Sequence, residues 1–335
     1  MSYRKEIDQL RALAVLGVFF YHINNNIFVY GFLGVDLFFV ISGYLISKQI
    51  FENLQKKKFS LSFFYIRRAR RLLPLLFTVI FFTLVFALIF LLPLELVNLA
   101  SSAIYSIFFT SNFYFWKKIN YFENLSSENP LLHLWSLSVE EQFYIFFPIF
   151  IIIGYKFFKS YLNFCLILFT LSSFILYFIF YEQFNSEVFY FPITRAWQLL
   201  IGYFAFRYEK HNFKINRFFI IPFFILIILI FFPYKFIDEK LLRIIISITA
   251  FLILINNQNK NFLNINILNI TGKISYGFYL WHFPILSFFF IIDYKVNFYS
   301  SIILFIFTYV LSLITFKFIE NPFRNIKIIN TRKFL

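Results

Sequence analysis

The sequence predicts an all-α fold, a polytopic membrane helix bundle of about ten transmembrane helices that forms a single integral-membrane domain over residues 1–335. The first observation behind this prediction is composition: 61% of the residues are hydrophobic and 14% are charged, whereas soluble domains carry roughly a quarter charged residues. The second is that the apolar residues come in blocks of about 17 to 25, the length that crosses the hydrocarbon core of a bilayer. The third is an uneven distribution of lysine and arginine among the connecting loops.

Ten apolar segments are long enough to be spans, at residues 8–29, 31–50, 72–93, 142–158, 161–181, 190–207, 217–233, 240–256, 275–292 and 299–319. If the N-terminus is cytoplasmic, most cations fall in the inner loops and the tail, above all in the loop 51–71. Cytoplasmic loops of membrane proteins collect such cations, so both termini are expected inside. The net charge of +15 is then explained by topology and lipid contact, and we expect no nucleic-acid partner.

The apolar segment 96–116 does not fit this count, because a crossing here would place the later basic loops outside. We therefore expect it to be re-entrant or to lie at the membrane interface, within an outer connection from 94 to 141.

Several charged or titratable residues lie within or beside the predicted spans, where such groups are rare and usually face the bundle interior or a polar cavity. They are His22, Asp36, His133, Glu140, Glu141, Arg195 and His282. Structural explanations exist for single members: Asp36 could pair with an arginine, and the spacing Ser138-x-x-Glu141 predicts a capping box that starts a helix. Their number, on different helices, favours a catalytic or transport cavity.

Asp8, Arg11 and His22 form one stripe of the first span. His22 lies eleven residues after Arg11, which leaves the two about 20° apart around a helix and about 16 Å apart along it. Asp8 and Arg11 could also be a simple interfacial ion pair.

A second basic cluster, in FFYIRRARRLLPLL, lies in the predicted inner loop directly before the third span. Its arginines could anchor the loop in the cytoplasm and contact anionic lipid, or they could bind phosphate through their planar donor groups. The motifs of a P-loop and of a dinucleotide fold are absent from the sequence, which argues against nucleotide sites of those types.

Five segments resemble acyltransferase family three, the multi-span acyltransferases of bacterial surface glycans, over residues 5 to 325. They are EIDQLRALAVLGVFFYH, GFLGVDLFFVISGYLIS, FYIRRARRLLP, LHLWSLSVEEQFY and ISYGFYLWHFP, with TRAWQLLIG and IENPFR as weaker support. The family pattern of a basic residue, ten residues and a histidine falls on Arg11 and His22, and the pattern R-x-x-R falls on Arg68 and Arg71. The other family positions fall on Asp36, His133, Trp135, Glu140, Glu141 and His282.

The resemblance implies transfer of an acyl group, usually acetyl, from acyl-coenzyme A to a hydroxyl of a cell-surface or lipid-linked carbohydrate. It implies a protein of the bacterial inner membrane in which Asp8, Arg11, Arg68 and Arg71 bind the coenzyme. His22 is expected to be the general base, because imidazole suits proton transfer near neutral pH, although an acyl-histidine intermediate is an open variant. Asp36 or Glu140 would orient the ring, while His133, His282 and Arg195 would bind the acceptor or the oxyanion. No metal and no bound cofactor are expected; acetyl-CoA is a co-substrate.

Two departures from the family stand out. Many relatives carry an extra span and a C-terminal hydrolase-like domain, which we expect to be absent here because the sequence stops at Leu335. Gln198 also stands where relatives often have glutamate. A transporter or flippase of a lipid-linked sugar is the alternative function, since it too uses intramembrane polar residues; such proteins often show internal repeats, and none is visible in this sequence.

Overall fold

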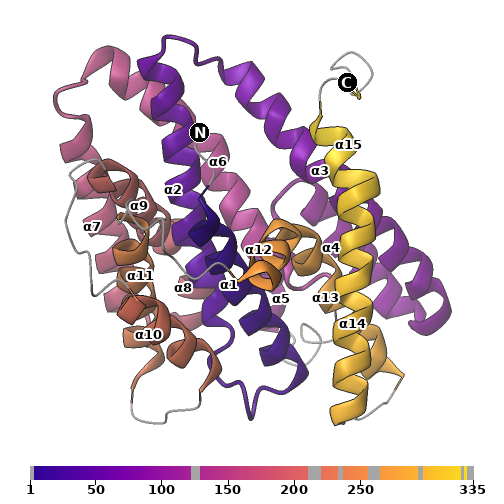
Figure 1. The fold of residues 1–335 in the computed structure, drawn as a ribbon. Coiled ribbons are helices and arrows are strands. Elements are labelled where there is room, and N and C mark those ends of the chain that lie inside the picture. The colour runs from indigo at the N-terminus through magenta and orange to yellow at the C-terminus, as the bar shows by residue number, and fades with distance from the viewer. Residues whose placement is uncertain are drawn as a thin grey trace. The chain divides into compact units, whose positions relative to one another are not determined.

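The computed structural model describes residues 4–121, 129–209, 220–232, 237–255, 265–292, 297–325 and 328–329. Within these ranges every regular element is a helix, in the order shown in Figure 1. The predicted all-α class is therefore confirmed. Each of the ten predicted spans overlaps a helix of the structure.

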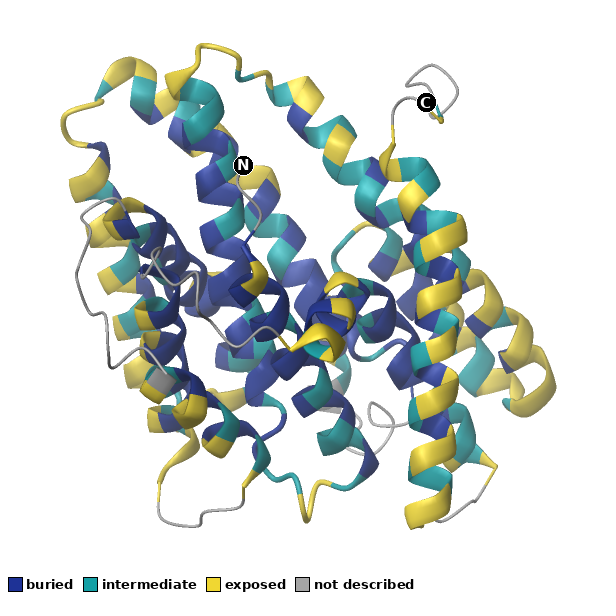
Figure 2. Cartoon of the chain, viewed as in Figure 1, coloured by how far each residue is buried: buried dark blue, intermediate teal, exposed yellow. Residues whose placement is uncertain are grey.

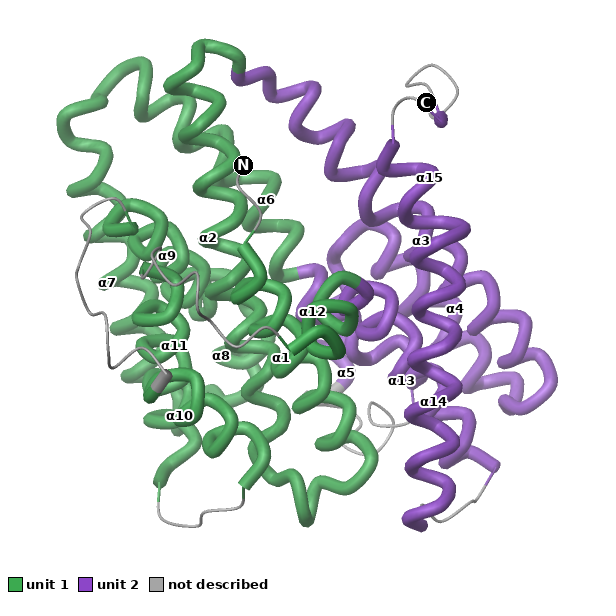
Figure 3. The backbone as a smooth tube through the Cα atoms, in the orientation of Figure 1, with its two compact units in different colours: residues 1–58, 139–273 green, residues 59–138, 274–335 purple. Residues whose placement is uncertain are grey.

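The chain divides into two compact units, Met1–Lys58 with Val139–Lys273 and Phe59–Ser138 with Ile274–Leu335, which Figure 3 shows in two colours. Each unit is made of two segments that are distant in sequence. The expectation of a single integral-membrane domain stays a prediction.

Unit 1 contains α1 (Lys5–Ile23), α2 (Leu33–Gln55), most of α6 (Leu134–Phe157), α7 (Leu162–Phe180), α8 (Asn185–Tyr190), α9 (Pro192–Tyr208), α10 (Ile220–Phe231), α11 (Glu239–Ile255) and α12 (Asn266–Lys273). Helices α2 and α9 are packed backbone to backbone. A Cβ at Gly43 would lie 1.8 Å from the carbonyl oxygen of Leu199, and one at Gly202 would lie 2.1 Å from that of Val40. Glycine is required at both positions because no side chain fits between the helices.

Unit 2 contains α3 (Leu61–Phe90), α4 (Pro93–Ile107), α5 (Ser111–Tyr121), the first residues of α6, α13 (Ser275–Ile291), α14 (Phe298–Thr315), the π-helical η2 (Phe316–Glu320) and α15 (Asn321–Arg324). Its apolar core joins α3 to α13 through buried side chains such as Leu75, Val79 and Leu280.

Five helical segments of the described residues are long and apolar enough to cross a membrane: α2, α3, α6, α7 and the continuous stretch Phe298–Arg324. These helices carry both buried and exposed residues, which Figure 2 shows in different colours. Only 22% of the most apolar window of α7 is buried inside the protein, and most of its exposed residues are phenylalanine, isoleucine and leucine, which suit contact with lipid tails. The chain is thus a multi-pass membrane protein. A total of ten crossings stays a prediction.

The arginine cluster before the third span is helical, so its predicted placement in a loop was wrong. Helix α3 begins at Leu61, where the Ser60 hydroxyl caps it by accepting a hydrogen bond from the backbone N–H of Phe63. Arginine and leucine propagate a helix well, and the Arg67 guanidinium stacks on the ring of Phe63 one turn earlier, at 4.7 Å from its centroid. The charge of these arginines therefore did not predict where the helix begins, and their placement on the cytoplasmic side stays a prediction.

The capping box predicted at Ser138 and Glu141 was also wrong. Helix α6 begins at Leu134, four residues before Ser138, so both residues lie inside it. The Ser138 hydroxyl instead forms a hydrogen bond with the hydroxyl of Ser111, at 2.7 Å. The same sequence pattern occurs when a serine caps its own helix and when it forms a hydrogen bond with another helix.

The segment 96–116 is divided between α4 and α5, which are separated at Phe109, a residue with a left-handed φ of 55°. Neither helix is among the candidate spans found in the described residues. Its re-entrant or interfacial placement stays a prediction.

Candidate active site

Helix α1 places Asp8, Arg11 and His22 on one uninterrupted helix from Lys5 to Ile23, as the sequence predicted. Arg11 Nη1 lies 4.0 Å from Asp8 Oδ1, so the two residues form an ion pair one turn apart. The backbone at Asp8 is covered by α12, because a Cβ at Gly272 would lie 1.9 Å from the Asp8 carbonyl oxygen. Glycine at position 272 allows this close approach, and the charged end of α1 is thereby fixed against a second helix.

His22 lies in the last turn of α1. The helix ends with a hydrogen bond from the Asn24 N–H to the Phe20 carbonyl, and the Asn24 side chain then accepts hydrogen bonds from Asn26 and Ile27 N–H. The imidazole stands edge-on to the Tyr21 ring, with centroids 5.2 Å apart. His22 therefore lies at the end of a helix that is terminated by a turn formed by the Asn24 side chain.

Asp36 is completely buried and is engaged on both carboxylate oxygens. Arg195 Nη1 and Gln198 Nε2 donate to Oδ1 at 3.0 and 2.6 Å, and Arg243 Nη1 donates to Oδ2 at 2.9 Å. The pairing with an arginine foreseen as a structural role is thus present. We call these four residues the Asp36 cluster.

The Asp36 cluster carries two arginines against one carboxylate, and aromatic rings cover the surplus charge. The Arg195 guanidinium lies 5.2 Å from the Phe189 ring centroid, and the Arg243 guanidinium lies 4.8 Å from that of Phe32 and 5.7 Å from that of Phe189. Cation–π contacts are strongest when desolvated, as here. Sequence reasoning missed Arg243, although an arginine inside the predicted span 240–256 was an available signal.

Glu140 joins α6 to α2. Its Oε1 accepts hydrogen bonds from the Ser42 hydroxyl, at 2.6 Å, and from the Tyr144 hydroxyl one turn along its own helix. Glu140 remains partly exposed, whereas its neighbour Glu141 is buried.

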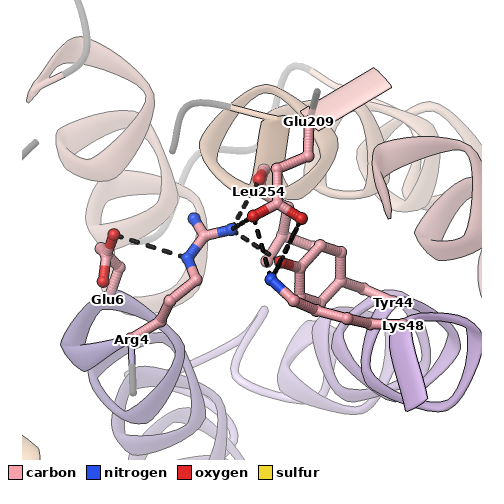
Figure 4. A network of polar contacts seen from close by, with 6 residues as sticks. All are labelled: Arg4, Glu6, Tyr44, Lys48, Glu209 and Leu254. Carbon is pink, nitrogen blue, oxygen red and sulfur yellow. Dashed lines mark hydrogen bonds and ion pairs between the residues drawn. The ribbon is translucent and has the colours of Figure 1, made fainter. Parts of the chain in front are cut away.

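A second buried polar network, drawn in Figure 4, lies near the other end of α2. It comprises Arg4, Glu6, Tyr44, Lys48, Glu209 and the carbonyl of Leu254. The Glu209 carboxylate accepts from Lys48 Nζ at 3.0 Å and from the Tyr44 hydroxyl at 2.8 Å. Arg4 Nη1 donates to Leu254 O at 3.0 Å and lies 3.3 Å from Glu209 Oε1. The network ties the start of α1 to α2, α9 and α11, and sequence reasoning missed it because its members lie in four separate segments.

In unit 2, Arg68 and Arg71 lie one turn apart on α3, and both are partly exposed. Arg70, between them, is 1% exposed and donates to the Ile329 carbonyl. Arg68 and Arg71, three residues apart, therefore share one helix face, and Arg70 between them binds the segment after α15.

His133 and His282 come together in unit 2. Their ring centroids are 5.3 Å apart, and the residues are 3% and 0% exposed. The Tyr279 hydroxyl donates to the His133 carbonyl at 2.8 Å and lies 2.6 Å from the Ser136 hydroxyl. The Tyr279 carbonyl in turn lies 2.5 Å from His282 Nδ1.

The predicted site residues thus divide between the two units. Unit 1 holds Asp8, Arg11, His22, Asp36, Glu140 and Arg195; unit 2 holds Arg68, Arg71, His133 and His282. The role of each remains a proposal.

Comparison with known proteins adds independent information. A family model described as an acyltransferase domain, of acyltransferase family three, matches residues 4–317. Among curated proteins, the chain is 35% identical over 350 residues to "Putative peptidoglycan O-acetyltransferase YrhL" of Bacillus subtilis (strain 168), covering 95% of this chain and 54% of that protein. It is 36% identical over 348 residues to "O-acetyltransferase OatA" of Staphylococcus aureus (strain NCTC 8325 / PS 47), covering 96% of this chain and 57% of the relative.

The chain therefore spans little more than half the length of these curated relatives. No solved structure matches it significantly.

Proposed function

Because the chain belongs to acyltransferase family three, we propose that it transfers an acetyl group from acetyl-CoA to a hydroxyl of a cell-envelope carbohydrate. Peptidoglycan is the acceptor class that we propose first, because the name of the Bacillus relative specifies it. The protein would act as a multi-pass enzyme of the bacterial inner membrane, with both termini cytoplasmic and lipid around its apolar faces.

The observation that carries this proposal is the continuity of α1. One helix holds the Asp8–Arg11 ion pair near its start and His22 in its last turn. The axial distance between Arg11 and His22 is about 16 Å, so a charged group and a titratable ring are separated by most of the helix. This arrangement suits a long donor whose acidic end and reacting thioester lie far apart.

The arginines would bind the acidic phosphate groups of the donor. Arg68 and Arg71 share one face of α3 and are partly exposed, and the planar donor groups of arginine match the oxygens of phosphate. Arg11, with Asp8 beside it, would hold the donor at the start of α1. Acetyl-CoA acts here as a substrate, and no bound cofactor is part of the proposal.

His22 would accept the proton of the acceptor hydroxyl as its oxygen attacks the thioester carbonyl. A carbon–oxygen bond forms, the carbon–sulfur bond breaks, and His22 passes the proton to the departing sulfur, which leaves as the thiol of CoA. In the covalent variant the imidazole attacks the thioester carbonyl first, the carbon–sulfur bond breaks and CoA leaves as the thiol with the proton of the imidazole. The acceptor hydroxyl then attacks the acetyl group, the bond between acetyl and imidazole breaks, and the imidazole takes the hydroxyl proton.

The remaining residues would stabilise charge. His133, His282 and Arg195 are proposed for the acceptor or the oxyanion, and Glu140 for orientation of the reacting groups. Asp36 is engaged by three donors, so its proposed contribution is electrostatic: it fixes two arginines in place.

The test is transfer of labelled acetyl from acetyl-CoA to purified peptidoglycan, using membranes that contain the protein and matched membranes that lack it. We expect label on the glycan only where the protein is present. Failure of folded protein to label any envelope glycan, together with movement of a lipid-linked sugar across the membrane, would favour the transporter instead.

A further inference from the structure

A continuous series of side-chain contacts leads from the Asp36 cluster to His22. Its first step is the Arg243 guanidinium, which donates to Asp36 and lies 4.8 Å from the centroid of the Phe32 ring. Phe32 is the residue directly before α2, and Asp36 lies in the first turn of that helix. Arg243 thus holds both the start of α2 and the ring that precedes it.

The next steps are aromatic. The Phe32 ring meets the Tyr21 ring edge to face, with centroids 5.6 Å apart, and Tyr21 meets the His22 imidazole edge to face at 5.2 Å. Such pairs have a preferred geometry, so a ring that is fixed on one side restricts the ring on the other.

The backbone brings these rings together at Gly31. A Cβ at this position would lie 2.2 Å from the Gly17 carbonyl oxygen and 2.9 Å from the Tyr21 Cβ. Only glycine allows the chain before α2 to lie this close to α1. Phe32 is consequently seated against Tyr21 by the path of the backbone as well as by Arg243.

We propose that Arg243 and Phe32 are positioning residues for the imidazole of His22. Helix ends fray, and His22 lies in the last turn of α1, so its ring needs lateral support to keep a reactive orientation. Arg243, Phe32 and Tyr21 supply that support. This inference rests on the proposed function, because it assumes that His22 reacts.

The chain offers a matched pair of substitutions. Phe32 and Phe189 both stack on the guanidinium of Arg243, at 4.8 and 5.7 Å, but only Phe32 belongs to the series that continues through Tyr21 to His22. Phe32→Leu therefore removes the support, whereas Phe189→Leu removes a ring that stacks on both Arg243 and Arg195 and leaves the contacts from Phe32 to His22 in place. Phe32→Tyr keeps the ring and serves as the conservative variant.

The experiment measures kcat and KM for acetyl-CoA with the full chain in membranes, for wild type, the three variants and His22→Ala. We expect Phe32→Leu to lower kcat by about tenfold or more with KM for acetyl-CoA unchanged, because a small misplacement of a reacting group lowers the rate steeply. Phe32→Tyr and Phe189→Leu should stay near the wild-type kcat. Arg243→Gln should show the same loss of kcat, and Arg243→Lys should restore part of it.

The outcomes separate the two proposals. If His22→Ala is inactive while Phe32→Leu keeps its kcat, or loses no more than Phe189→Leu, the positioning role is overturned and the proposed function stands. If His22→Ala keeps the wild-type rate, the assignment of the base fails and the positioning role fails with it.

Discussion

Arg243 donates a hydrogen bond to Asp36 at 2.9 Å, although the two residues are 207 positions apart in sequence. The bond joins the first turn of α2 to α11, and Arg195 on α9 donates to the other carboxylate oxygen. One carboxylate is therefore the shared counter-ion of two buried arginines that hold three helices of unit 1.

Asp36→Asn should destabilise the protein strongly, because it leaves two buried guanidinium groups without a carboxylate. Breaking a buried ion pair in this way costs about 3–5 kcal/mol, which should lower the apparent melting temperature in detergent by roughly 5–10 °C. Glu182→Gln removes the same charge from a side chain that is 81% exposed, and should leave the melting temperature nearly unchanged. Equal effects of the two substitutions would contradict the structural role of Asp36.

Gln198→Glu should rescue Asp36→Asn. Gln198 donates to Asp36 at 2.6 Å, so a glutamate at this position restores one carboxylate beside the two arginines. In a double-mutant cycle of melting temperatures, the double variant should be more stable than Asp36→Asn alone. Additive losses would show that a carboxylate at position 198 does not reach the arginines.

The Figure 4 network predicts a strong coupling between Glu209 and Lys48. Glu209→Gln should cost about 3 kcal/mol, since it leaves Lys48 and Arg4 buried beside a neutral side chain. Adding Lys48→Met removes one of the unpaired charges, so the double variant should lose less than the sum of the two single variants. Thermal unfolding of the four proteins measures this coupling, and strict additivity would mean that the ion pair contributes nothing.

Arg68→Ala/Arg71→Ala should raise KM for acetyl-CoA by about tenfold or more while leaving kcat at saturating donor largely intact, because loss of a charge-assisted contact to phosphate weakens binding. Arg207→Ala removes an exposed arginine from the C-terminal turn of α9 and should change neither constant. A fall in kcat at unchanged KM would assign the α3 arginines a role other than donor binding.

Periodicity and spacing were enough to predict the helical class, a helix at each of the ten expected spans, and the common stripe of Arg11 and His22. These features depend on local sequence: apolar length, and about 3.6 residues per turn. The pairing of Asp36 with an arginine was also foreseeable, since a buried charge needs a partner, although its identity was not.

The partners themselves could not be predicted. Arg243 reaches Asp36 across 207 residues, and Arg4 reaches Glu209 across 205, so both contacts depend on how distant helices pack. The same reason explains the errors at helix ends. Ser138 fits a capping pattern but bonds Ser111 on another helix, and the arginines of α3 continue a helix that their charge suggested was a loop.

The most direct test of the central claim is the kcat of His22→Ala at saturating acetyl-CoA, measured as labelled acetyl transferred to peptidoglycan, with acetyl-CoA binding determined on the same preparation. Our account predicts that transfer falls by at least about a hundredfold while acetyl-CoA still binds, because the general base is lost and the donor site remains. Wild-type transfer by the folded His22→Ala protein would contradict the account and show that another group accepts the proton.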